Sequence, residues 1–124
     1  MNKQKNILVI EDEAAMAEAI KLRLEANGFA VSLASDGQEG LNKVRAEIPD
    51  LIILDVMLPK MNGFTLCRML KFDEKYRKIP IIMFTAKTQQ KDIKEGEEVG
   101  ANAYITKPFK SEELLQKIKE LLKK

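Results

Sequence analysis

Five side chains that could take part in chemistry each follow a short apolar run in the sequence. They are Glu11, Asp12, Asp55, Thr85 and Lys107. The apolar runs that precede them are residues 7–10, 51–54, 79–84 and 103–106. Short apolar runs without polar alternation are typical of strands buried on both faces of a parallel sheet. Because ligands bind at the carboxyl ends of such strands, we expect the five side chains to meet at one edge of a sheet.

The three acids at this edge favour a divalent cation. Carboxylates about 5 Å apart repel each other by about 3 kcal/mol per pair at an effective dielectric constant of about 20, and a bound cation removes that repulsion. The sequence has no histidine and a single cysteine, Cys67. Oxygen ligands alone are typical of Mg²⁺, which binds proteins through one or two carboxylates. We therefore expect a Mg²⁺ site.

A metal ion, a lysine and a hydroxyl group around one carboxylate are the parts that phosphoryl transfer requires, because charge on the transferring group must be neutralised. Asp55 would be the nucleophile, since its carboxylate is ionised at neutral pH and can form an aspartyl phosphate. Asp12 would hold Mg²⁺, with Glu11 beside it. Lys107 and Thr85 would contact the oxygens of the phosphoryl group.

Changes in hydrophobic period predict the elements that must hold these side chains. Strands are expected at 6–10, 29–34, 51–55, 79–84 and 103–106, and helices at 14–27, 36–48, 64–71, 89–99 and 111–122. This alternation predicts an α/β fold with a flavodoxin-like, doubly wound five-stranded parallel sheet of order 2-1-3-4-5 and five helices. The switch point of that order lies between the first and third strands, which are the two that end in acids.

Local signals predict details of the helices. Asp36, with Glu39 three residues later, resembles a capping box. Ser111 should cap the last helix. In the third helix, Met69 should face inward with the neighbouring leucines, and Cys67 is most simply a small residue of the core or its boundary.

The composition is that of an ordinary globular chain. Its 124 residues, 45% hydrophobic and 32% charged, suffice for one domain over 1–124. The net charge of +2 is too small for a dedicated nucleic-acid binder. The lack of histidine excludes triads built on it. The first apolar run is too short for a signal peptide, and no run approaches the roughly 20 residues of a membrane span. We therefore expect a cytoplasmic protein.

Four motifs carry a family resemblance. They are Glu11-Asp12, Asp55-Val56-Met57-Leu58-Pro59-Lys60-Met61-Asn62-Gly63, Thr85-Ala86 and Lys107-Pro108-Phe109. Each is weak alone, but together their order and spacing are specific. On these motifs, and over essentially all 124 residues, the chain resembles the receiver domains of two-component response regulators, and it is similar in length to single-domain chemotaxis-type regulators. The resemblance implies a signalling switch phosphorylated at Asp55, which assists its own phosphorylation and dephosphorylation and is not a turnover enzyme.

The resemblance also implies details of the site. The main-chain carbonyl of Met57 would complete the protein ligands of the metal. The first acid of the pair is Glu11 and not an aspartate, a difference that the family admits. Glu11 would act beside the ion or through a water. The Lys107–Pro108 peptide bond would be cis.

The switch implied by the resemblance runs through a hydroxyl residue and an aromatic one. Thr85 would be drawn toward the phosphoryl group, and Tyr104 would then turn inward. The face made by the helix over 89–99, the fifth strand and the last helix would change, and the few apolar anchors of that helix suit such a role. A sensor histidine kinase or a histidine phosphotransfer protein would donate the phosphoryl group. The phosphorylated chain would then act on a downstream target or output domain, or form a phosphorylation-dependent homodimer. It would not bind nucleic acid or membrane directly.

Three alternatives come from other classes of protein. A Mg²⁺-dependent phosphatase with an aspartate nucleophile would carry a second acid where Met57 stands. A flavodoxin-type electron carrier needs a hydroxyl- and glycine-rich loop after the first strand, and Glu11-Asp12-Glu13 would repel its phosphate. The chain could also be the receiver half of a DNA-binding transcription regulator, although such members often have two acids where Asn102-Ala103 stand here.

Overall fold

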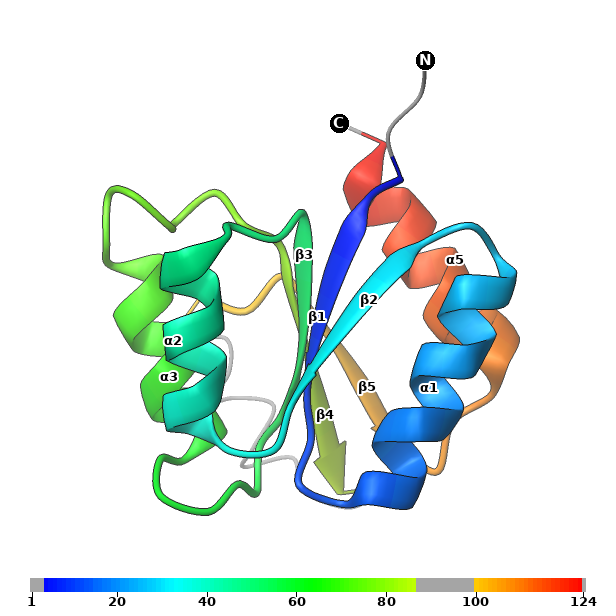
Figure 1. Ribbon diagram of the computed structural model, residues 1–124, viewed down its shortest axis with the longest axis horizontal. Coiled ribbons are helices and arrows are strands. Elements are labelled where there is room, and N and C mark those ends of the chain that lie inside the picture. The colour runs from blue at the N-terminus through cyan, green and yellow to red at the C-terminus, as the bar shows by residue number, and fades with distance from the viewer. Residues whose placement is uncertain (1–3, 87–99, 124) are drawn as a thin grey trace.

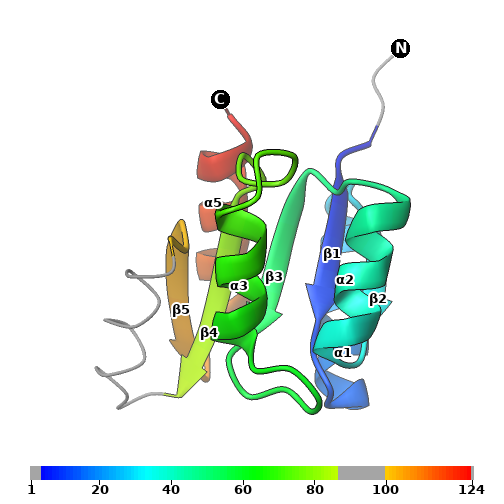
Figure 2. The same ribbon diagram turned by 90° about the vertical axis from the view of Figure 1, so that its left-hand side faces the viewer.

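The computed structural model describes residues 4–86 and 100–123 and shows one sheet. Its strands are β1 (Asn6–Ile10), β2 (Ala30–Ala34), β3 (Leu51–Asp55), β4 (Ile81–Ala86) and β5 (Ala103–Lys107). All neighbouring strands are parallel, in the order β2-β1-β3-β4-β5. The predicted flavodoxin-like order is therefore confirmed. In Figure 2 the strands run toward the same lower edge.

Four helices lie within the described residues and cover both faces of the sheet. They are α1 (Ala14–Ala26), α2 (Gly37–Ala46), α3 (Gly63–Lys71) and α5 (Ser111–Leu122). The helix expected over 89–99 lies outside the described residues. Figure 1 shows α2 and α3 on one face of the sheet and α1 and α5 on the other. Within the described part of the chain, no helix is long and apolar enough to span a membrane.

The uninterrupted apolar runs reflect burial on both faces of the sheet. All five residues of β3 are buried. Ile52 faces the core beneath α2 and α3, whereas Leu51 and Ile53 face the core beneath α1 and α5, because successive side chains of a strand point to opposite faces. Each such side chain contributes roughly 1.5–3 kcal/mol on burial. The strand is therefore a rigid support for the acid at its end.

Two helix starts differ from the predicted capping. The Asp36 side chain accepts from the Glu39 backbone N–H at 2.8 Å, as expected, but the Glu39 carboxylate accepts from the backbone N–H of Ser35, at 2.7 Å, in place of that of Asp36. The predicted cap at Ser111 is wrong, since α5 begins at Ser111 and Lys110 takes the cap position with no side-chain hydrogen bond.

Two further predictions are wrong by about two positions in the sequence. Met69 of α3 is 41% exposed, and fully buried Cys67 takes the inward position, because the inner face of this short helix follows positions 63, 66, 67 and 70. The fourth strand begins at Ile81 and not at residue 79, because the backbone N–H of Ile79 donates to the Tyr76 carbonyl in the preceding turn.

Candidate functional site

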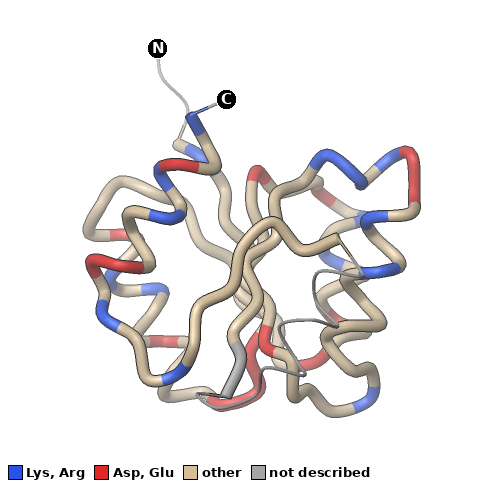
Figure 3. Tube along the Cα trace, turned by 180° about the vertical axis from the view of Figure 1, so that it is seen from behind, with Lys and Arg blue, Asp and Glu red and all other residues tan. Residues whose placement is uncertain are grey.

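The sheet register brings the predicted site residues to one edge. Ile10 pairs with Leu54, so Glu11 and Asp12 follow β1 beside Asp55 at the end of β3. Thr85 of β4 pairs with Thr106, and Ala86 with Lys107. All of these positions lie at the carboxyl ends of parallel strands, where doubly wound sheets bind ligands. Figure 3 shows acidic segments gathered at this lower edge.

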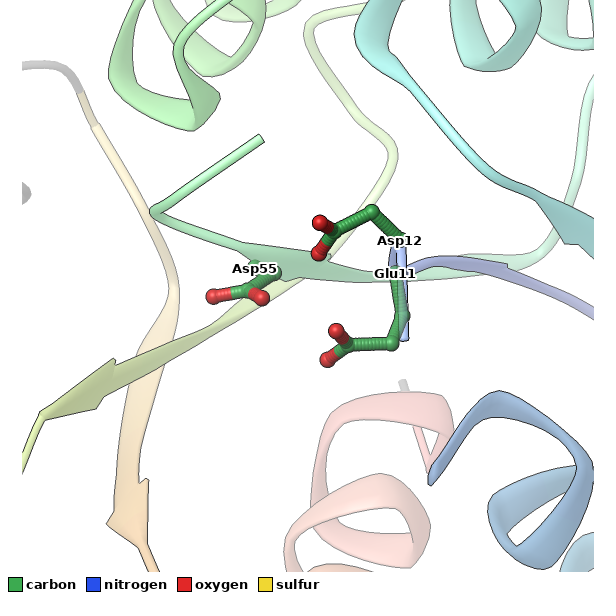
Figure 4. A group of neighbouring side chains, drawn as sticks. All are labelled: Glu11, Asp12 and Asp55. Atoms are coloured by element: carbon green, nitrogen blue, oxygen red, sulfur yellow. The ribbon is translucent and has the colours of Figure 1, made fainter. Parts of the chain in front are cut away.

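Three carboxylates form a compact cluster at this edge. Glu11, Asp12 and Asp55 each offer one oxygen, and these oxygens all lie within 4.8 Å of one another. Figure 4 shows the side chains of Glu11 and Asp12, which follow β1, extending toward Asp55 at the end of β3. Glu11 and Asp55 are only 3% and 5% exposed, whereas Asp12 is exposed. Two of the three acids are thus removed from most of the solvent that would stabilise their charge.

Lys107 joins the two buried acids. Its Nζ donates to Glu11 Oε1 at 3.2 Å and to Asp55 Oδ2 at 3.1 Å. The second oxygen of Glu11 accepts from the Glu13 backbone N–H at 3.1 Å, and Oδ1 of Asp55 accepts from the Met57 backbone N–H at 3.2 Å. One ammonium group therefore donates hydrogen bonds to two carboxylates, one directly after β1 and one at the end of β3.

Burial and neighbouring charges both shift the pKa values of Glu11 and Lys107. Burial raises the pKa of Glu11 to about 7, and the charge of Asp55 adds to that effect, although the Glu13 backbone N–H and Lys107 oppose it. Burial alone would lower the pKa of Lys107, but its hydrogen bond and ion pair with Asp55, and then those with Glu11, raise it overall. Lys107 therefore does not offset the effect of burial on the pKa of Glu11.

The donor set fits a hard divalent cation. Three carboxylate oxygens converge from the ends of β1 and β3, and no nitrogen or sulfur ligand belongs to the group. Oxygen-only sites of this kind are typical of Mg²⁺, Ca²⁺ or Mn²⁺. Exposed Asp12 gives such an ion a route from solvent.

The turn after β3 is packed tightly against the strand that carries the buried acid. The Gly63 backbone N–H donates to the Val56 carbonyl at 3.0 Å, and the Asn62 side chain caps α3 by accepting from the Phe64 N–H at 2.7 Å. A Cβ atom on Gly63 would lie 2.2 Å from the carbonyl oxygen of Asp55. Only glycine allows the two segments to approach so closely.

Gly63→Ala is therefore expected to lower the free energy of unfolding by about 3 kcal/mol, because the atom that it meets is backbone and cannot rotate away. Urea denaturation measures the loss. Gly28→Ala is a matched control: Gly28 has φ +92° and open space around it, so backbone strain alone should cost about 1 kcal/mol. Equal losses for the two variants would contradict the close contact.

The remaining predicted residues lie on or just after strands β3, β4 and β5. Met57 follows β3, and its side chain is 74% exposed. Thr85 belongs to β4 at the same edge of the sheet. Tyr104 of β5 is half-buried and packs against the core beneath α2 and α3. The Lys107–Pro108 bond is cis, which confirms the implied geometry.

Sequence reasoning gave no role to two aromatic residues beside the site. Phe84 directly precedes Thr85, and its ring centroid lies 5.9 Å from Lys107 Nζ. Phe109 stacks against Phe84. The only sequence signal was the aromatic character of the positions before Thr85 and after Pro108.

Comparison with known proteins decides the family. The response regulator receiver domain model matches residues 7–119. The chain belongs to this family. As a response regulator receiver domain, it is a component of two-component signalling. The predicted resemblance is therefore confirmed over nearly the whole chain.

Three relatives show how this receiver domain compares in sequence and structure. It is 42% identical over 121 residues to the DNA-binding response regulator MtrA of Mycobacterium tuberculosis, an alignment that covers 98% of this chain and 52% of MtrA. The chain thus spans about half the length of the curated relatives that it matches.

The chemotaxis response regulator CheY4 of Vibrio cholerae matches with a TM-score of 0.90 and 32% identity, over 97% of this chain and 100% of that one. The receiver domain of a sensor histidine kinase from Pseudomonas aeruginosa PAO1 matches with a TM-score of 0.90 and 30% identity, over 98% and 100% of the two chains. That structure holds a magnesium ion in its active-site cleft.

Proposed function

We propose that this receiver domain accepts a phosphoryl group on Asp55 in a Mg²⁺-dependent reaction. The observation that carries the proposal is the convergence of Asp55 with Glu11, Asp12 and Lys107 at one edge of the sheet. A carboxylate oxygen of Asp55 forms a bond to the phosphorus of a phosphohistidine. The P–N bond breaks, its electron pair stays on the imidazole of the donor, and an acyl phosphate results.

The chain's own residues hold the reacting groups in place. Asp55 is presented by a rigid buried strand, and its carboxylate is already positioned by Lys107 and by the Met57 backbone N–H. Lys107 neutralises charge on the phosphoryl oxygens, and the hydroxyl of Thr85 contacts one of them. Removal of the carboxylates from bulk water strengthens each of these electrostatic contacts.

A bound metal completes the charge balance of the proposed site. Asp12, Asp55 and the main-chain carbonyl of Met57 would hold Mg²⁺, with Glu11 beside it or linked through a water. When bound, Mg²⁺ would supply the positive charge that offsets the negative charge of the transferring phosphoryl group. The magnesium ion in the Pseudomonas receiver domain supports this choice of metal.

The receiver domain acts as a phosphoacceptor that assists its own phosphorylation and dephosphorylation. The alternative of a phosphatase with an aspartate nucleophile lacks support, because the position for its acid or base holds Met57, an uncharged side chain.

Signalling partners follow from the family. A sensor histidine kinase or a histidine phosphotransfer protein donates the phosphoryl group in the cytoplasm. Thr85 and Tyr104 relay phosphorylation to the face that includes β5 and α5, where a target, an output domain or a second copy of the chain docks. This chain itself does not contact nucleic acid or membrane.

A second candidate is that the chain is the receiver half of a DNA-binding transcription regulator. The 42% identity to MtrA, over about half of that protein, favours it. Asn102, which stands where such regulators often have an acid, has a structural role in this chain. Its side-chain Oδ1 accepts from the Ile81 N–H, and its backbone N–H donates to the Ile81 carbonyl, both at 2.9 Å.

Intact mass spectrometry tests the proposal. The protein is incubated with Mg²⁺ and acetyl phosphate or phosphoramidate, and with a purified sensor kinase that labels other receivers. A gain of one phosphoryl group that disappears when the metal is chelated is the expected result. No gain from any of the three donors would overturn the proposal.

A further inference from the structure

The ammonium group of Lys107 lies beside an aromatic pair as well as beside the acids. Its Nζ is 5.9 Å from the ring centroid of Phe84, within the range of a cation–π contact. Phe84 is fully buried in β4 and pairs with Asp55 in the sheet register. Its ring packs against that of Phe109, with centroids 4.8 Å apart and planes inclined by 32°, a separation usual for aromatic pairs.

The aromatic pair is anchored in the core beneath α1 and α5. Phe109 is half-buried and packs against that core. It also lines a hollow between α1 and α5, together with Met16, Ile20 and Leu114. Phe84 therefore contacts both a ring that packs against that core and the ammonium group of Lys107.

We propose that the Phe84–Phe109 pair positions Lys107 for phosphoryl transfer, an inference that rests on the role proposed above for Lys107. Lysine has a flexible stem with several rotatable bonds, so holding its ammonium in place costs entropy unless a neighbour restrains it. A ring face attracts the cation without offering an oxygen acceptor, which leaves the three N–H donors of Lys107 for carboxylate and phosphoryl oxygens.

The acids alone cannot give Lys107 a constant environment. One of its two carboxylate partners, Asp55, becomes an acyl phosphate during the reaction, so the charge that attracts Lys107 changes as the bond forms. The aromatic pair keeps the same charge and shape throughout. Phe84 and Phe109 are therefore positioning residues that act through Lys107.

Labelling rates with subsaturating acetyl phosphate test the inference. Phe84→Leu and Phe109→Leu are each expected to slow labelling about threefold to tenfold, which corresponds to the loss of one cation–π contact and part of its support. Phe109→Tyr keeps the ring and should restore the wild-type rate. The affinity for Mg²⁺ should not change in any of the three, because neither ring belongs to the carboxylate cluster.

A double-mutant cycle with Lys107→Ala separates positioning from general stability. In the Lys107→Ala background, the leucine substitutions should change the rate less than about twofold. Phe72→Leu is the matched control, because Phe72 is 72% exposed at the far end of α3, and it should leave the rate unchanged. Thermal unfolding identifies any variant that fails to fold. If Phe84→Leu fails to fold, the Phe109 variants provide the test, because Phe109 is only half-buried.

The outcomes distinguish this inference from the proposed function. No labelling of the wild-type protein by any donor overturns the proposed function and the positioning role with it. If the wild type is labelled normally but the leucine substitutions slow labelling equally in the wild-type and Lys107→Ala backgrounds, the positioning role alone is overturned. Slowing by Phe109→Tyr equal to that by Phe109→Leu also overturns it.

Discussion

Asp55→Asn is expected to abolish acid-labile incorporation of phosphate from acetyl phosphate, a loss of at least about 100-fold, because a neutral amide cannot act as the nucleophile that forms an acyl phosphate. The substitution preserves size in a position that is only 5% exposed, so the fold should persist. Radiolabelled phosphate in the protein, counted before and after mild acid treatment, measures the effect.

Asp50→Asn is the matched control for that loss. Asp50 directly precedes β3, at the opposite edge of the sheet, where its carboxylate accepts from the Asn6 backbone N–H at 2.7 Å. Its labelling should equal that of the wild type. Undiminished labelling of Asp55→Asn would show that another residue accepts the phosphoryl group.

Asp12→Asn is expected to weaken Mg²⁺ binding by about tenfold or more, because loss of even an indirect partner of a metal ligand commonly costs that much. Asp12 is the exposed member of the carboxylate cluster, and its carboxylate is proposed to bind the ion directly. Isothermal titration calorimetry measures the affinity without an optical probe, which suits a chain that has no tryptophan.

Glu13→Gln is the control for the metal titration. Glu13 is exposed and lies in the same acidic stretch, but its carboxylate does not belong to the cluster. Its substitution should leave the Mg²⁺ affinity within about twofold of the wild type. Equal affinities for Asp12→Asn and the wild type would remove Asp12 from the proposed ligand set.

The strand order and the meeting of Asp55 with Glu11 and Asp12 could be predicted from the sequence. The reason is physical: strands buried on both faces give uninterrupted apolar runs, and parallel strands bring their carboxyl ends to the same edge. The acids at the ends of two such runs therefore had to be neighbours. Their individual burial could not be predicted, because it depends on how the loops after β1 and β3 cover them.

Side-chain detail within the elements was less predictable. Cys67 and Met69 differ in burial because of the helical phase of α3, which a nine-residue segment specifies weakly. Ser111 is the first residue of α5, and Lys110 holds the cap position without a side-chain hydrogen bond, because sequence signals locate a helix start only to within about one or two residues. The contact between Lys107 and Phe84 depends on side-chain conformations across the β4–β5 pair, and no sequence period encodes it.

Chemical mapping of the acceptor tests the central claim most directly. The protein is phosphorylated with acetyl phosphate and Mg²⁺ and then treated with borohydride, which reduces an aspartyl phosphate to homoserine, and peptide mass spectrometry locates the product. Homoserine at position 55, formed only when both the donor and Mg²⁺ are present, is the predicted result. Reduction at Asp12 or at another acid, with residue 55 unmodified, would contradict the assignment of Asp55 as the phosphoacceptor.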